Sequence, residues 1–334
     1  MRTWSRVQIR EDKSMNDVLT RFQKLGIIPV VKIDNAKDAV PLAKALCEGG
    51  LPVAEVTFRT DAAEEAIREM SKAFPEMFVG AGTVLTTEQV DRAVAAGAKF
   101  IVSPGFNPVV VKYCVDKNIP ITPGTSSPSE IEQAIGFGLE AVKFFPAEAS
   151  GGIAKIKAMA GPYTQMKFMP TGGINADNLC SYLDFPKILA CGGSWMVSDK
   201  LINAGEFDKI KELTTQAVNT MLGFEIAHVG INSENEAEAE LTANFFAKAF
   251  GFEKKVGGSS IFAGKGVEVM KTKYLGANGH IGIRTNYPER AVFHLENRGL
   301  KFDPETAKYD DKGNLKAIYL KDQIAGFAVH IVKK

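Results

Sequence analysis

The strongest constraint on the fold of this chain is a regular alternation between residues 27 and 195. Short apolar or β-branched segments recur every twenty-odd residues, which predicts strands. Between them lie segments with apolar residues at three- and four-residue spacing, which predicts helices. The predicted strands number eight: Ile27–Ile33, Val53–Phe58, Met77–Val84, Phe100–Pro104, Ile119–Pro123, Ala141–Pro146, Lys167–Thr171 and Ile188–Gly192.

Eight consecutive strand–helix units predict a compact (β/α)₈ TIM barrel. Helices are expected at 36–49, 62–74, 88–96, 129–137 and 153–160. Capping residues are expected at Asn35, Thr87 and Ser127, and at Asn175 before a further helix that starts at Ala176. A doubly wound open sheet is the alternative. Such a sheet seldom has eight evenly spaced units, and no G-x-G-x-x-G motif follows the first predicted strand.

The pattern changes after residue 223, and the remaining segment repeats itself. His228-Val-Gly-Ile231 recurs as His280-Ile-Gly-Ile283, 52 positions later. Each copy precedes a predicted helix that stops at a glycine, Gly251 or Gly299, and three short strands follow each helix. We therefore expect a barrel over residues 1–223 and a smaller α+β domain of two β-α-β-β-β modules over residues 224–334, called the tail below.

Composition excludes several functions. The first 227 residues contain no histidine, so a Ser–His–Asp triad or a histidine-ligated zinc is excluded there. The net charge of +1 provides no field that would attract nucleic acid or an anionic membrane. No segment approaches the roughly 18 apolar residues of a membrane span, and the polar segment 1–16 does not resemble a signal peptide.

The four cysteines have no metal-binding spacing. They indicate reduced thiols, as expected in a cytoplasmic protein.

The active site of a (β/α)₈ barrel lies at the carboxyl ends of its strands, and Lys143 is the most unusual residue there. An ammonium group within an apolar strand is costly to bury unless it is paired or neutral. A neutral lysine amine is the nucleophile that forms Schiff bases with carbonyl substrates. Glu55, on another apolar strand, is a candidate proton shuttle. A purely structural Lys143–Glu55 ion pair is the alternative.

Three further features follow predicted strands. Arg59 has the forked geometry that binds a carboxylate, although a rim salt bridge would use it equally well. Gly172-Gly173 and Gly192-Gly193-Ser194 follow the seventh and eighth strands, where barrels often bind phosphate through backbone N–H groups. Any tight turn also uses such glycines.

Together, these segments resemble the class I 2-keto-3-deoxy-6-phosphogluconate (KDPG) / 4-hydroxy-2-oxoglutarate aldolase family, from about residue 17 to residue 223. The similar motifs occur in the family's order: Glu55–Thr60, Gly80–Val84, Ser103–Gly105, Val142–Glu148, Pro170–Ile174 and Gly192–Trp195. The resemblance implies a homotrimer that needs no cofactor. It also implies cleavage of KDPG to pyruvate and glyceraldehyde 3-phosphate, and possible cleavage of 4-hydroxy-2-oxoglutarate to pyruvate and glyoxylate.

The resemblance also implies residue roles. Lys143 matches the lysine that forms the Schiff base, and Glu55 the glutamate that moves protons. The other matching positions bind substrate: Arg59 and Thr83 at the pyruvyl end, Pro104 and Phe145 around the imine, Thr171 in the gluconate-derived subgroup, and Gly172, Gly173, Gly193 and Ser194 at the phosphate end.

The tail resembles the vicinal oxygen chelate (glyoxalase and bleomycin-resistance) superfamily. Metal-binding members take ligands from the first and last strands of each module, and the matching positions here are His228, Glu268, His280 and His330. The departure is His330, where glutamate is usual. A three-histidine, one-carboxylate set suits Zn²⁺, Ni²⁺, Mn²⁺ or Fe²⁺. His294 is expected to be an ordinary helix residue.

Three alternatives remain open at this point. The chain is an aldolase with an accessory domain, a bifunctional enzyme with a metal-dependent tail, or an aldolase whose tail only binds a ligand or assembles.

Overall fold

The computed structural model describes residues 15–334, so most of the polar N-terminal segment discussed above lies outside the described residues. The chain divides into two compact units. The first ends at Met221 and contains the alternating strands and helices, whereas the second covers Leu222–Lys334 and contains the tail, residues 224–334. No helix within residues 15–334 is both long and apolar enough to cross a membrane.

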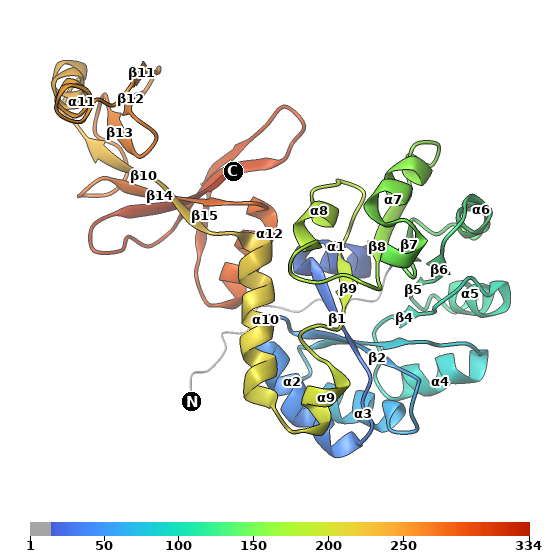
Figure 1. Ribbon diagram of the computed structural model, residues 1–334. Coiled ribbons are helices and arrows are strands. Elements are labelled where there is room, and N and C mark those ends of the chain that lie inside the picture. Colours follow the sequence, from blue (N-terminus) through green and yellow to red (C-terminus); the bar gives the residue numbers. More distant parts are fainter. Residues whose placement is uncertain (1–14) are drawn as a thin grey trace. The chain divides into compact units, whose positions relative to one another are not determined.

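The first unit has a (β/α)₈ barrel-like fold, in which parallel strands are surrounded by helices (Figure 1). One sheet has the order β5-β4-β3-β2-β1-β9 and a second has the order β6-β7-β8. Single bridges at Phe168–Ile188 and Thr171–Gly192 link β8 to the segment of β9. The strands are β1 (Ile27–Val31), β2 (Val53–Thr57), β3 (Phe78–Gly82), β4 (Ile101–Val102), β5 (Ile121–Thr122), β6 (Gly124–Thr125), β7 (Ala141–Phe144), β8 (Lys167–Pro170) and β9 (Cys191–Gly193).

The helices of this unit follow the predicted periodicity. In α3, for example, the buried residues are Ala63, Ala66, Ile67 and Met70, which share one face because they are three or four positions apart. The helices and 3₁₀ turns are α1 (Met15–Leu25), η1 (Ala36–Asp38), α2 (Ala39–Glu48), α3 (Ala63–Ala73), α4 (Thr87–Ala95), α5 (Pro108–Asp116), α6 (Pro128–Gly136), η2 (Glu148–Ser150), α7 (Gly152–Ala160), α8 (Leu179–Leu183), α9 (Asp199–Asn203) and α10 (Phe207–Leu222).

Each of the eight predicted strands overlaps an observed strand, but the observed strands are shorter. The fifth ends before Pro123, which has no N–H group to donate to a ladder, and β6 lies beyond its predicted range. The eighth begins at Cys191 rather than Ile188, because Ile188 forms only an isolated bridge to Phe168.

Two predicted helix starts are also wrong. Thr86, not Thr87, caps α4 by accepting a hydrogen bond from the backbone N–H of Gln89. Asn175 accepts a hydrogen bond from the N–H of Asp177 and so closes a local turn, and α8 starts only at Leu179. The predicted cap at Ser127, by contrast, is confirmed, and with Glu130 it forms a capping box at the start of α6.

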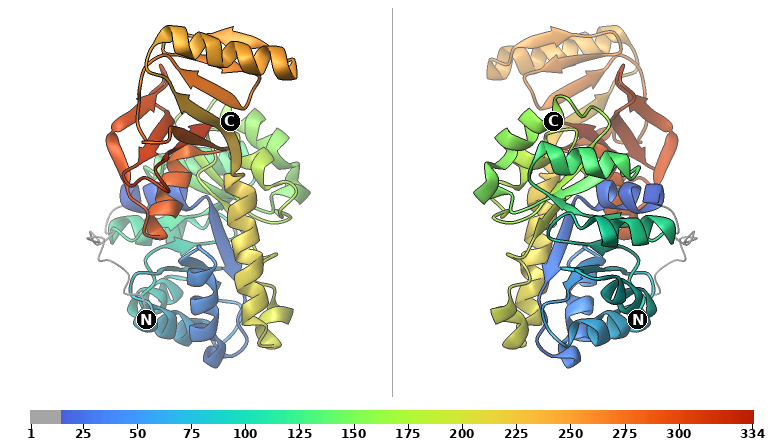
Figure 2. Two further views of the ribbon diagram at one scale, coloured as in Figure 1. Left: turned by 90° about the vertical axis from the view of Figure 1, so that its left-hand side faces the viewer. Right: turned by 90° about the vertical axis from the view of Figure 1, so that its right-hand side faces the viewer.

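The tail contains the element order β-α-β-β-β twice. Both modules join one eight-stranded sheet with the order β11-β12-β13-β10-β14-β17-β16-β15, in which the first strands, β10 and β14, pair antiparallel at the centre. Helix α11 lies across the strands of its own module (Figure 2). The elements are β10 (Glu225–Asn232), α11 (Glu236–Phe250), β11 (Lys254–Val256), β12 (Ser260–Ala263), β13 (Val267–Met270), β14 (His280–Thr285), α12 (Pro288–Asn297), β15 (Phe302–Tyr309), β16 (Leu315–Leu320) and β17 (Ala328–Lys333).

Candidate active site

Lys143 and Glu55 meet inside the barrel. Lys143 lies on β7 and Glu55 on β2, and the Nζ atom of Lys143 donates a hydrogen bond to Oε1 of Glu55 at 2.9 Å. The side chain of Lys143 is 6% exposed and that of Glu55 is 1% exposed. Oε2 of Glu55 is buried and has no hydrogen-bond partner within the described residues. One carboxylate oxygen therefore remains available for a substrate or water molecule.

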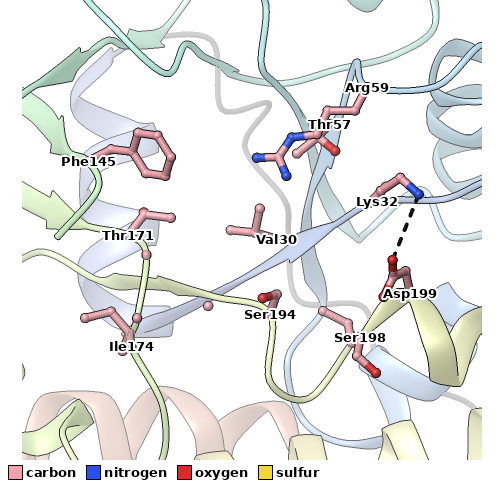
Figure 3. Close-up of a pocket in the computed structure, with 14 residues that line it drawn as sticks. Val30, Lys32, Thr57, Arg59, Phe145, Thr171, Ile174, Ser194, Ser198 and Asp199 are labelled. Atoms are coloured by element: carbon pink, nitrogen blue, oxygen red, sulfur yellow. Dashed lines mark ion pairs between the residues drawn. The ribbon is translucent and has the colours of Figure 1, made fainter. Parts of the chain in front are cut away.

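A cavity of about 400 Å³ opens at the carboxyl ends of the strands. Figure 3 shows Phe145 and Thr171 on one side and Lys32 and Arg59 on the other, with the guanidinium of Arg59 pointing toward Phe145. Nζ of Lys143 lies 5.6 Å from the centre of the Phe145 ring, so the lysine adjoins the cavity wall. Seven of the predicted binding residues line this cavity: Arg59, Phe145, Thr171, Gly172, Gly173, Gly193 and Ser194.

Four predicted residues are not among those that line the cavity: Lys143, Glu55, Thr83 and Pro104. Thr83 is nevertheless linked to it, because the Nε–H group of Arg59 donates to Thr83 Oγ1 at 3.3 Å. Thr83 also has a φ of 56°, which is unusual for a residue other than glycine. Such strain concentrates at functional sites. Pro104 follows β4 and packs its carbonyl against Gly124, where a β-carbon would lie 2.1 Å away.

The glycine pair after β8 has a conformation that other residues rarely adopt. Gly172 and Gly173 have φ values of 99° and 80°. The loop is anchored because the N–H of Ala147 donates to the carbonyl of Thr171, and that of Glu148 to the carbonyl of Gly172. Its backbone is therefore fixed beside the cavity without any side chain projecting from these two positions.

Sequence reasoning missed several residues that line the cavity. Lys32 follows β1 and forms ion pairs with Asp34 at 2.8 Å and with Asp199 at 4.0 Å. The available signal was a lysine inside the first predicted strand, Ile27–Ile33. Asp199 and Ser198 belong to the start of α9, a region that carried no motif. Thr57 lay inside a quoted motif without being singled out, and its hydroxyl donates to the carbonyl of Val31.

In the tail, the structure brings the four predicted metal donors together. Nε2 of His228 lies 3.2 Å from Nε2 of His280, 3.1 Å from Nε2 of His330 and 3.1 Å from Oε2 of Glu268. The same Glu268 oxygen is 3.2 Å from Nε2 of His280. All three histidines are buried. His294 lies in α12 and is not part of the cluster.

Glu268 is the second residue of β13 and His330 is the third residue of β17, the last strands of the two modules. Each of these strands pairs with the first strand of its module, β13 with β10 and β17 with β14, which places the two donors beside the central pair of strands.

The electrostatics of this cluster suit a cation. Burial opposes ionisation of Glu268, but hydrogen bonds from His280 and Ser260 outweigh it and lower the pKa of Glu268 to about 2. Burial and the neighbouring imidazoles lower the pKa of His330 to about 3, and burial also lowers the pKa of His228. At neutral pH, His228 and His330 are therefore neutral and Glu268 is ionised, which are the protonation states that bind metal.

The barrel site defines a class of enzyme. A buried lysine paired with a glutamate, next to a cavity at the carboxyl ends of (β/α)₈ strands, is the arrangement of a class I, Schiff-base-forming aldolase. The model of the KDPG and KHG aldolase family matches residues 18–213, and the chain belongs to this family.

Known proteins agree with this assignment. The chain is 50% identical over 202 residues to the 2-dehydro-3-deoxy-phosphogluconate aldolase of Haemophilus influenzae, covering 60% of this chain and 95% of the relative. It is 44% identical over 192 residues to the KHG/KDPG aldolase of Escherichia coli, covering 58% and 90%. The KDPG aldolase structure from Legionella pneumophila, with pyruvate captured as a covalent carbinolamine, superimposes with a TM-score of 0.58 at 41% identity, covering 60% and 97%.

Proposed function

We propose that the barrel cleaves KDPG to pyruvate and glyceraldehyde 3-phosphate, and that it also cleaves 4-hydroxy-2-oxoglutarate to pyruvate and glyoxylate. The observation that carries this proposal is the buried pair of Lys143 and Glu55 beside a cavity that Gly172, Gly173 and Gly193 also line. This chain matches 95% and 90% of the length of two relatives whose names contain these substrates, which supports the same substrates here.

In this proposal, Glu55 accepts a proton from Nζ of Lys143, and the resulting amine adds to the C2 ketone to form a carbinolamine. Glu55 returns the proton to the carbinolamine hydroxyl group, which leaves as water, and a protonated imine remains. Glu55, acting through a water molecule, accepts the proton of the C4 hydroxyl group. The C3–C4 bond breaks, its electron pair moves into the imine, and the aldehyde leaves. Glu55 then helps to protonate the resulting enamine at C3, and hydrolysis of the imine releases pyruvate and restores the amine.

The two ends of the substrate have different partners. Arg59, aligned by its hydrogen bond to Thr83, binds the carboxylate of the pyruvyl half. Phe145 and Pro104 pack around the imine, and Thr171 lies beside the reacting carbons. The N–H groups of Gly172, Gly173 and Gly193, together with the hydroxyl of Ser194, bind the phosphate, because backbone N–H groups in tight loops suit anions.

Release of pyruvate tests this proposal. With the full-length protein, KDPG should give pyruvate with a higher kcat/KM than its unphosphorylated analogue. Equal kcat/KM values for the two substrates would contradict the proposed phosphate site. If neither KDPG nor 4-hydroxy-2-oxoglutarate released pyruvate, the proposed substrates would be wrong.

We also propose that the chain forms a homotrimer through the barrel, as the family resemblance implies. Light scattering on the full-length protein should then give a mass of three chains of 36.1 kDa. A monomeric mass would contradict this assembly.

A second candidate function concerns the tail. We propose that His228, Glu268, His280 and His330 bind one divalent metal, as in the vicinal oxygen chelate proteins that the tail resembles. The observation that supports it is the grouping of three imidazole nitrogens that lie within 4.8 Å of one another, with a carboxylate oxygen of Glu268 within 3.2 Å of two of them. Such a site would either give the chain a second, metal-dependent activity or stabilise a ligand-binding or assembly domain.

Metal analysis of the full-length protein tests this second proposal. After incubation with Zn²⁺ and gel filtration, the wild type should retain one ion per chain. Glu268→Gln should retain much less, because it removes the only anionic donor. Glu253→Gln is the matched control, since Glu253 is exposed in the same unit. Metal-free wild-type protein after this treatment would contradict the site.

A further inference from the structure

The two glycines of the repeated His-x-Gly motif lie directly beneath the metal-site histidines of the opposite module. In the antiparallel pairing of β10 with β14, His228 faces Gly282 and Gly230 faces His280. Residues two apart on a strand share one face of a sheet. Both histidines and both glycines therefore lie on the same face of the sheet, and each histidine is paired with the glycine of the other module.

The next strands extend this arrangement. β13 pairs with β10, and β17 pairs with β14, on the outer sides of the central pair. Each glycine consequently lies between two of the four donors, one from each module. Gly230 pairs with Glu268 and His280, and Gly282 pairs with His228 and His330.

These glycines are required for space and not for backbone conformation. A β-carbon on Gly230 would lie 2.0 Å from Cε1 of His280, and one on Gly282 would lie 2.5 Å from Cε1 of His228. Neither glycine is among those with positive φ, so alanine could adopt either backbone conformation. The β-carbon of an alanine at either position would, however, displace the facing imidazole ring.

The position of the rings is what brings the nitrogen atoms together. Because each ring lies across the glycine of the other module, the Nε2 atoms of His228 and His280 approach to 3.2 Å. Both then lie within 3.2 Å of the same oxygen of Glu268. A ring displaced by a β-carbon would move its nitrogen away from this shared point.

We propose that Gly230 and Gly282 are positioning residues for the tail metal site, because each leaves the space that the histidine ring of the other module occupies. The two copies of the His-x-Gly motif thus form one structural unit, which exists only when the two modules pair. This inference rests on the proposed metal site, and it adds the part of the site that carries no donor atom.

The first test is Zn²⁺ affinity, measured with the full-length protein by competition against a chromophoric chelator. Gly230→Ala and Gly282→Ala should each weaken binding by at least about 10-fold, the lower end for loss of support around a metal ligand. Gly266→Ala is the matched control, because a β-carbon there meets nothing within 4 Å and the backbone has no positive φ. Wild-type affinity in both glycine variants would overturn the proposal.

The second test needs no metal and separates this inference from the metal proposal. In metal-free full-length protein, Gly230→Ala should speed hydrogen–deuterium exchange in β10 and β14. In a His280→Ala background the ring is gone, so adding Gly230→Ala should cause no further increase. Equal increases in both backgrounds would overturn the ring–glycine relationship. The predicted coupling together with a wild type that binds no Zn²⁺ would instead reject only the metal site.

Discussion

Gly82 provides the space that the carboxylate of Glu55 occupies: a β-carbon on Gly82 would lie 2.3 Å from Oε1 of Glu55. This is the same oxygen that accepts the hydrogen bond from Nζ of Lys143. The glycine at the end of β3 therefore determines where the carboxylate can lie, and with it the position of the proton-transfer group relative to the lysine.

Gly82→Ala should consequently lower kcat by about 10²-fold, the size of effect that a displacement of about 1 Å in a catalytic group can cause. The carboxylate is the end of a flexible side chain, so it can move while the barrel remains folded. Gly136→Ala in α6 is the matched control, because a β-carbon there meets nothing within 4 Å. Wild-type turnover by Gly82→Ala would show that the carboxylate position is unimportant.

Glu55→Gln should slow turnover by roughly 10²–10⁴-fold, since the amide keeps the size of the side chain but cannot accept the proton. Trapping of the imine with borohydride should still occur, because Lys143 remains. Steady-state kinetics and mass spectrometry measure the two effects separately. Full activity in this variant would refute the proton-transfer role of Glu55.

Ser194→Ala should reduce kcat/KM for KDPG by about 10- to 100-fold, the range expected for one hydrogen bond to a charged group. The same variant should leave kcat/KM for 4-hydroxy-2-oxoglutarate unchanged, because that substrate has no phosphate. The unphosphorylated substrate thus serves as an internal control. A parallel loss on both substrates would indicate that Ser194 acts near the reacting carbons instead.

Removal of metal should affect only the tail. Treatment with EDTA is expected to leave aldolase turnover unchanged, because Lys143 and Glu55 supply the chemistry without a metal ion. It should increase hydrogen–deuterium exchange in β10 and β14, since a ligand that binds only the folded state stabilises it. If turnover fell on chelation and returned with Zn²⁺, the proposed mechanism of the barrel would need a metal.

Much of the barrel was predictable because its strands are buried and read as apolar segments. The residues of β2, for example, are all buried, and Val53–Phe58 stands out in the sequence for that reason. The exact helix starts were less accessible. Thr86 and Thr87 are chemically equal as caps, and only the backbone conformation decides between them.

The site was predictable where a residue type was unusual for its position and unpredictable where distant segments meet. Lys143 is conspicuous within an apolar strand. Lys32 and Asp199, by contrast, come together only because β1 pairs with β9 when the barrel closes. In the tail, the repeat indicated which histidines correspond. The pairing of Gly230 with His280, however, depends on a strand register that no local pattern reveals.

Covalent trapping of pyruvate tests the central claim most directly. Incubation of the full-length protein with pyruvate and borohydride should add one pyruvyl mass per chain, and peptide mapping should place it on Lys143. Lys143→Arg, which keeps a cation beside Glu55 but has no nucleophilic amine, should gain no mass. Addition to a different lysine, or no addition to the wild type, would contradict the assignment of Lys143 as the Schiff-base residue.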